Sequence, residues 1–136
     1  MKRVLVIDDA RTIHDCFRLA LERLGYDVRC ASTGPEGLLM AQSTQPDLVF
    51  LDLKLPEVDG VDTLVQLRAS GFDAPVFLIS GFVDEFMARL QDIKHLGLDF
   101  ELMHKPLDID QIATVVNILL GENEFGEEER PACGAS

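Results

Sequence analysis

The sequence is short of basic residues. It has 12 lysines and arginines against 24 aspartates and glutamates, which gives a net charge of -12 at pH 7. A surface with this excess of negative charge repels the phosphates of nucleic acids and the headgroups of anionic lipids. The composition therefore argues against nucleic-acid and membrane partners. It suits a protein that binds Mg²⁺ or a basic partner surface, although such a charge most often serves only solubility.

Cysteine is also scarce. The three cysteines, Cys16, Cys30 and Cys133, are an odd number, and no two of them form a C-x-x-C pair. This pattern argues against a disulfide framework and against a zinc site, and it fits the reducing environment of the cytosol. We therefore expect a cytoplasmic protein whose cysteines are ordinary small apolar or tail residues.

Long apolar runs are absent as well. The run at residues 4–7 stops at Asp8 after four residues, which is too short for a signal peptide. No stretch approaches the roughly 20 apolar residues that span a membrane. With 136 residues, of which 47% are hydrophobic, the chain has the size and composition of one globular domain.

The sequence does contain short apolar runs that alternate with amphipathic segments. Runs without a polar face indicate strands buried on both sides, and apolar residues at helical spacing indicate helices. Five such pairs predict a doubly wound α/β fold, a three-layer (βα)5 sandwich with a parallel five-stranded sheet. Strands are expected at about residues 4–7, 26–31, 48–51, 76–79 and 100–103, and helices at about 13–24, 35–42, 60–70, 86–96 and 109–120.

The composition changes after Gly121. Residues 122–129 are acidic and show no periodicity, which is typical of a solvated, disordered segment. We therefore expect one domain over residues 1–121 and a disordered acidic tail over residues 122–136. An alternative is that the tail is a docking peptide anchored by Phe125.

Polar residues follow the apolar runs at the points where the strands end. Asp8 and Asp9 follow the first run, Asp52 the third, Ser80 the fourth and Lys105 the fifth. The carboxyl ends of parallel strands share one edge of the sheet, and ligands bind there, where the strand order reverses. If the strand order is 2-1-3-4-5, strands one and three flank this reversal, and the three aspartates would converge on one point.

Three neighbouring carboxylates need a compensating positive charge, or one of them must take up a proton, because each close pair costs on the order of 1–4 kcal/mol at a partly solvated site. Mg²⁺, a hard cation that accepts few protein ligands, provides this compensation best. The same group suits phosphoryl transfer, in which an aspartate attacks phosphorus and a metal, a lysine and a hydroxyl stabilise the charge. Taken singly, each of these residues could equally be an ordinary turn, cap or solvated residue.

Four stretches resemble the receiver domains of two-component response regulators. They are VIDD at residues 6–9, LDLKLPEVDG at 51–60, ISG at 79–81 and HKP at 104–106, and the resemblance extends over about residues 2–120. It implies a flavodoxin-like sheet of order 2-1-3-4-5. It also implies that Asp52 is the phosphoacceptor, and that Asp9, Asp52 and the backbone carbonyl of Lys54 bind Mg²⁺. Asp8 would act largely through a metal-bound water.

The resemblance assigns further residues to the phosphoryl group and to water. Lys105 would hold the phosphoryl oxygens, Ser80 would move to bond them, and the Lys105–Pro106 bond would be cis. Lys54 and Phe82 would stand at the mouth of the site and govern the access of water.

The fifth strand departs from the family pattern. Leu102 stands where many members have an aromatic residue that turns inward with the switch. The switch is therefore expected to use Phe82, Phe86 or Phe100, or to rely on the loop after Ser80.

The function implied is that of a single-domain response regulator rather than an enzyme. A sensor histidine kinase or a histidine phosphotransfer protein would phosphorylate Asp52. The phosphoryl group would then bias the face of the fourth helix, fifth strand and last helix towards a downstream protein partner, with homodimerisation as one outcome.

Two alternatives stay open. One is a receiver-like module that binds partners without phosphorylation, which Leu102 keeps in consideration. The other is an Mg²⁺-dependent phosphohydrolase with an aspartyl nucleophile. That enzyme family places a second aspartate two residues after the nucleophile, where this chain has Lys54.

Overall fold

The computed structural model of the chain describes residues 1–81 and 83–121. The expected acidic tail over residues 122–136, with Phe125 and Cys133, lies outside the described residues, and so does Phe82. Within the described part, no helix combines the length and the apolar character needed to cross a bilayer.

The strands form one parallel sheet in the order β2-β1-β3-β4-β5. This confirms the predicted fold class and strand order. The strand order reverses between β1 and β3. These two strands are parallel neighbours, so their carboxyl ends lie beside each other. The strands are β1 (Arg3–Ile7), β2 (Asp27–Ala31), β3 (Leu48–Asp52), β4 (Val76–Ser80) and β5 (Glu101–His104).

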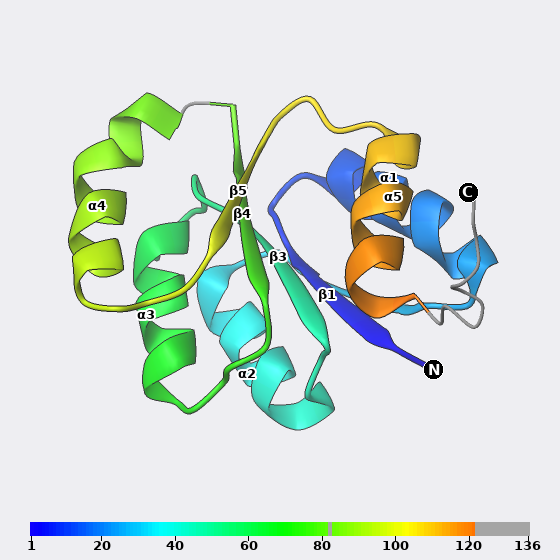
Figure 1. Ribbon diagram of the computed structural model, residues 1–136, viewed down its shortest axis with the longest axis horizontal. Helices are drawn as coiled ribbons and strands as arrows, with labels where there is room; N and C mark the ends of the chain where they lie inside the picture. The colour runs from blue at the N-terminus through cyan, green and yellow to red at the C-terminus, as the bar shows by residue number, and fades with distance from the viewer. Residues whose placement is uncertain (82, 122–136) are drawn as a thin grey trace.

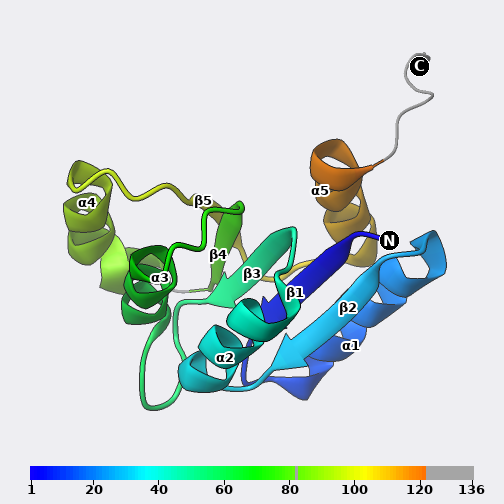
Figure 2. The same ribbon diagram turned by 90° about the horizontal axis from the view of Figure 1, so that it is seen from below.

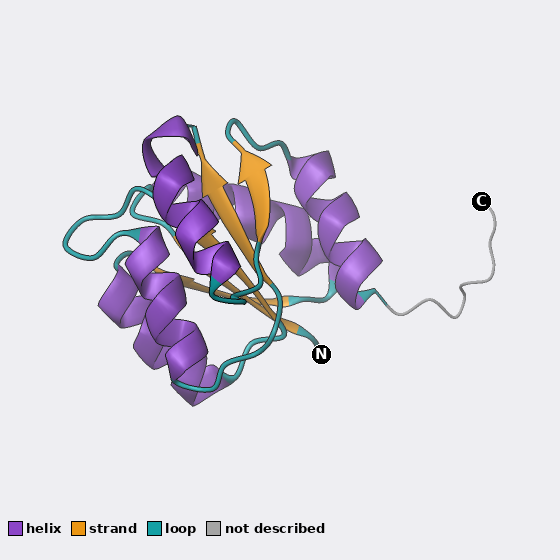
Figure 3. Ribbon diagram, turned by 60° about the vertical axis from the view of Figure 1, so that its left-hand side comes forward, coloured by secondary structure: helices purple, strands orange, loops and turns teal. Residues whose placement is uncertain are grey.

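Helices cover both faces of the sheet, as Figures 1 and 3 show. In Figure 1, α1 and α5 lie on one side of the strands, and α2, α3 and α4 lie on the other. The helices are α1 (Arg11–Leu21), α2 (Gly34–Thr44), α3 (Gly60–Ala69), α4 (Met87–His95) and α5 (Ile109–Leu120), with short 3-10 turns η1 (Glu22–Leu24) and η2 (Val83–Phe86).

Side-chain caps explain where three of the helices begin. Thr33, Asp59 and Asp108 each accept a hydrogen bond from a backbone N–H in the first turn of α2, α3 and α5. Helix α2 extends two residues beyond the predicted end, because Gln45, with φ of 49°, is the first residue to take the left-handed conformation that ends it.

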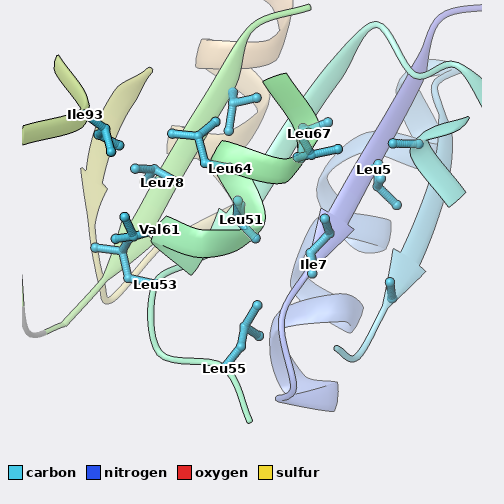
Figure 4. Packing of buried hydrophobic residues seen from close by; sticks show 14 of the residues in the cluster. Leu5, Ile7, Leu51, Leu53, Leu55, Val61, Leu64, Leu67, Leu78 and Ile93 are labelled. Atoms are coloured by element: carbon cyan, nitrogen blue, oxygen red, sulfur yellow. The ribbon is translucent and has the colours of Figure 1, made fainter. Parts of the chain in front are cut away.

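The core has two layers because the central strands bury both of their faces. All five residues of β3 are buried, as are Val4–Ile7 in β1. Figure 4 shows the layer under α2, α3 and α4. It includes Leu5, Ile7, Leu51, Leu64, Leu67, Leu78 and Ile93, whereas the opposite layer, under α1 and α5, includes Val6, Phe17, Phe50, Ile79, Ile112 and Val116.

Strand β5 lies at the edge of the sheet and, unlike the central strands, is mostly exposed. It pairs only with β4, and Met103 is its one buried residue. Leu102 is 38% exposed, so its side chain is not part of the core. The strand runs one residue later than predicted, because a mostly exposed edge strand lacks the continuous apolar run that marks the central strands.

Candidate functional site

Three aspartates from β1 and β3 meet at the carboxyl edge of the sheet, towards which the arrowheads in Figure 2 point. Asp8 and Asp9 directly follow β1, and Asp52 is the last residue of β3. One carboxylate oxygen of each lies within 4.8 Å of the others. Asp8 and Asp52 are buried, whereas Asp9 is exposed. The convergence predicted from the strand order is therefore observed.

Asp8 is held in place through its backbone and one carboxylate oxygen. Its Oδ1 accepts a hydrogen bond from Ala10 N at 2.9 Å. The imidazole Nε2 of His14, on α1, lies 2.6 Å from the backbone oxygen of Asp8. The contact of His14 could not be predicted from the sequence, because nothing in the spacing of residues indicates which side of α1 faces this loop.

Lys105 places a positive charge between two of the carboxylates. Its Nζ lies 3.1 Å from Oδ2 of Asp8 and 3.5 Å from Oδ2 of Asp52. Burial on its own would lower the pKa of Lys105, but the contacts with Asp8 and Asp52 outweigh it and raise that pKa. Lys105 is therefore a permanent cation at neutral pH. The Lys105–Pro106 bond is cis, as expected.

Asp52 is in an environment that disfavours its charge. Burial, and then the negative charge of Asp8, raise its pKa to about 6, against the opposing effect of Lys105. Its Oδ1 accepts a weak hydrogen bond from Lys54 N at 3.3 Å. Asp52 is consequently ionised at neutral pH, but only by a small margin.

Ser80 ends the strand next to Asp52. Asp52 pairs with Ile79 in the β3–β4 register, so Ser80 lies one residue further along the same edge. Ser80 is buried, and its backbone oxygen accepts a hydrogen bond from Lys105 N at 3.0 Å. The ammonium of Lys54 lies 3.4 Å from Oε1 of Glu85.

The donor set fits a hard divalent cation. Asp8 Oδ2 is buried and makes no hydrogen bond of acceptable geometry within the described residues, although Lys105 is near it. A single ammonium thus leaves three carboxylates incompletely neutralised. Oxygen donors with this residual negative charge are the ligands that Mg²⁺ takes in proteins, often with several waters retained.

The start of α3 packs directly on the backbone of the site. Gly60 N donates to Leu53 O at 2.8 Å, and a Cβ on Gly60 would lie 2.3 Å from Asp52 O. Only glycine fits this close approach. The preceding residue, Asp59, caps α3 and binds Arg89 of α4. The role of Arg89 could not be predicted from the sequence, because a contact between two helices leaves no local pattern.

The model of the response regulator receiver domain family matches residues 4–117. The chain belongs to this family. Receiver domains are signalling domains of two-component systems and are generally not enzymes. Phosphorylation on an aspartate, an acidic Mg²⁺ pocket and interaction with histidine kinases are typical of them.

Curated relatives are longer proteins than this receiver chain. The alkaline phosphatase synthesis transcriptional regulatory protein PhoP of Bacillus subtilis is 36% identical over 124 residues, which cover 91% of this chain and 50% of PhoP. The DNA-binding dual master transcriptional regulator RpaA of Synechocystis is 37% identical, over 88% of this chain and 49% of RpaA. The chain thus spans about half the length of these relatives.

Solved receiver structures superpose on the fold. The receiver domain of the Francisella response regulator 1452 has a TM-score of 0.74 at 28% identity, covering 88% of this chain and 96% of that one. The chemotaxis protein CheY4 of Vibrio cholerae has a TM-score of 0.76, with 88% and 99% covered, and at 23% identity it supports the fold alone.

Proposed function

We propose that Asp52 accepts a phosphoryl group from a phosphohistidine protein and that the receiver then switches a protein-binding surface. The observation that carries this proposal is the meeting of Asp8, Asp9 and Asp52 within 4.8 Å, beside the ammonium of Lys105. The donor would be a sensor histidine kinase or a histidine phosphotransfer protein. The site lies in a single domain over residues 1–121, and the protein would act in the cytoplasm.

The transfer exchanges one phosphorus bond for another. A carboxylate oxygen of Asp52 forms a bond to phosphorus as the phosphorus–nitrogen bond of the donor breaks, and the electron pair stays on the histidine nitrogen, which takes up a proton. Asp52 must be ionised to attack, and its pKa of about 6 permits this at neutral pH. The product is an acyl phosphate on a buried carboxylate.

The residues around Asp52 divide the work of charge stabilisation. Asp9, Asp52 and the carbonyl of Lys54 would hold Mg²⁺, with Asp8 acting through a water. The ion supplies positive charge to the phosphoryl oxygens. Lys105 provides a second positive charge. Its ammonium is positioned next to Asp8, at 3.1 Å, and next to Asp52, at 3.5 Å.

The switch begins at Ser80. Its hydroxyl would be drawn to the new phosphoryl oxygens, and the β4–α4 segment that follows would move with it. The face formed by α4, β5 and α5 would then bind a downstream protein or a second copy of the chain. Leu102 is 38% exposed and has no ring, so this receiver would switch through the segment after Ser80 rather than through an aromatic side chain on β5.

Intact-protein mass spectrometry after incubation with acetyl phosphate tests the acceptor chemistry. We expect one phosphoryl adduct on the wild-type chain with Mg²⁺, and none with EDTA or in Asp52→Ala. Asp47→Ala is the matched control, since Asp47 lies at the opposite edge of the sheet, where it accepts from Arg3 N at 2.8 Å. It should behave as the wild type. No adduct on the wild type despite intact Mg²⁺ binding would favour phosphorylation-independent partner binding.

A further inference from the structure

A second set of charged contacts joins α4 to the start of α3. The guanidinium of Arg89, in α4, donates to both carboxylate oxygens of Asp59, at 2.5 Å and 3.3 Å. It also donates to Oδ1 of Asp62 at 2.7 Å. The planar fork of arginine suits such paired contacts with carboxylates. One side chain of α4 therefore binds two acids in the first turn of α3.

The Asp59 end of this contact is rigidly connected to the phosphoacceptor. Asp59 caps α3 through Asp62 N at 3.0 Å. The next residue, Gly60, packs on the backbone of Asp52 with no room for a Cβ, which would lie 2.3 Å from Asp52 O. Close-packed backbone transmits small displacements rather than absorbing them. A shift of the loop between β3 and α3 must therefore reach Asp59.

The α4 end has few other attachments. Leu90 and Ile93 are the buried residues of this nine-residue helix, and Met87 at its start is 39% exposed. A second ion pair, Lys54–Glu85, runs from the same loop to η2, but both partners are more than half exposed. Exposed pairs of that kind contribute little. The fork of Arg89 on Asp59, whose side chain is 25% exposed, is the better anchored contact.

The charges of the pair persist over a wide pH range. Burial would raise the pKa of Asp59, but the hydrogen bonds from Arg89 and from the backbone of Asp62 and Val61, together with the charge of Arg89, outweigh it and hold the pKa below its usual value. The hydrogen bond that Arg89 donates to Asp59 in turn raises the pKa of Arg89. Both groups are therefore ionised in any buffer in which Asp52 is.

We propose that Arg89 is a positioning residue that makes α4 follow the state of Asp52. The inference rests on the proposed function, because it concerns how phosphorylation of Asp52 is transmitted. When Mg²⁺ and a phosphoryl group rearrange the loop between β3 and α3, Asp59 moves with it, and the guanidinium carries α4 along. Without the guanidinium, Asp52 still accepts a phosphoryl group, but the response of α4 is smaller.

Hydrogen exchange of the α4 amides in the full chain tests this coupling. Exchange is measured with and without Mg²⁺ and excess acetyl phosphate, and the adduct on each sample is quantified by intact mass. Arg89→Gln removes the cation. Asp59→Asn removes the anion but keeps a good N-cap for α3. Arg29→Gln is the matched control, because Arg29 also pairs with an aspartate, at 3.1 Å, and its side chain is 47% exposed against 42% for Arg89.

We expect the change in α4 exchange on phosphorylation to be at least about fivefold smaller in Arg89→Gln and Asp59→Asn than in the wild type, which is the lower end of the usual range of coupling between sites. Their adduct yield should stay within about twofold of the wild type. In Arg29→Gln, the change in α4 exchange on phosphorylation should equal that of the wild type. Arg89→Lys should recover only part of the response, because an ammonium cannot reproduce the fork.

Several results would overturn the inference. A change in α4 exchange as large in Arg89→Gln as in the wild type would show that Arg89 does not transmit the state of Asp52 to α4. An adduct yield that falls in parallel with the change in α4 exchange would show the same. So would a phosphorylated wild type whose α4 exchange is unchanged, and in that case the acceptor chemistry of Asp52 stands. A wild type that forms no adduct at all contradicts the proposed function, and the inference falls with it.

Discussion

At the scale of single residues, the three acids of the site differ in how far they are buried. Asp8 and Asp52 are buried, whereas Asp9 is exposed. Burial and the charge of Asp8 raise the pKa of Asp52 to about 6. The polar residues that follow the strands predict that these acids meet once the strand order implied by the family resemblance is assumed. The sequence does not show their burial, which depends on the side chains that cover the edge.

The raised pKa of Asp52 predicts pH-dependent Mg²⁺ binding. Below about pH 6 a proton competes with the ion for the carboxylate, so affinity should fall towards tenfold per pH unit between about pH 6 and pH 5. Between about pH 7 and pH 8 it should change little. Calorimetric titration at constant ionic strength measures this. An affinity that is constant down to about pH 5 would contradict the assignment.

The same shift predicts how Asp52 affects stability without Mg²⁺. Its pKa is about 6 in the folded chain, above the value of about 3.9 for an unfolded chain. The folded state therefore binds more protons between these values, and stability falls as pH rises through that window. Asp52→Asn removes this loss of stability. The free energy of unfolding of the variant should exceed that of the wild type by an amount that grows from near zero at about pH 4 to an upper bound of about 2–3 kcal/mol at about pH 7.5.

Urea denaturation in EDTA at those two pH values measures the gain. Asp47→Asn serves as the control for removing one carboxylate elsewhere. A gain that is equal at both pH values, or larger in acid, would show that burial and Asp8 do not govern the charge of Asp52.

At the scale of elements, predictability follows burial pattern. The sequence locates β1, β3 and β4 closely, because a continuous apolar run bounded by polar residues is typical of a strand buried on both faces. The prediction for β5 is displaced by one residue because only Met103 is buried in that strand. The contact of Arg89 with α3 could not be predicted, since it depends on how α3 and α4 pack rather than on either helix alone.

The junction of β3 and α3 predicts a specific cost for Gly60→Ala. The new methyl group meets the backbone oxygen of Asp52 at 2.3 Å, and backbone cannot move aside as a flexible side chain can. We expect a loss of about 1–3 kcal/mol in the free energy of unfolding, as for other overpacked positions. Because the strain falls on Asp52, Mg²⁺ affinity should fall as well.

Gly81→Ala is the matched control for that prediction. The nearest atom to its new methyl group is Lys105 Cβ at 4.0 Å, so stability should change by less than about 0.5 kcal/mol. Chemical denaturation and Mg²⁺ titration of the two variants measure both effects. Equal stability of Gly60→Ala and the wild type would show that α3 is not packed tightly against the site.

At the scale of the whole molecule, topology turns residues that are far apart in sequence into one site. The ends of β1 and β3 bring carboxylates to one edge of the sheet, and the loop after β5 brings the ammonium of Lys105 to the same edge. The reversal of strand order between β1 and β3 places these groups together. This arrangement was predictable, because parallel strands share their carboxyl edge. The central claim that follows is that phosphorylation occurs on Asp52 and on neither neighbouring acid.

Borohydride reduction after phosphorylation tests that claim most directly. It converts an aspartyl phosphate into homoserine, and peptide mass spectrometry then locates the altered residue. After treatment with acetyl phosphate and Mg²⁺, we expect homoserine at position 52 alone, and none when EDTA replaces Mg²⁺. Homoserine at Asp8 or Asp9, or an adduct on a residue that borohydride does not reduce, would contradict the account.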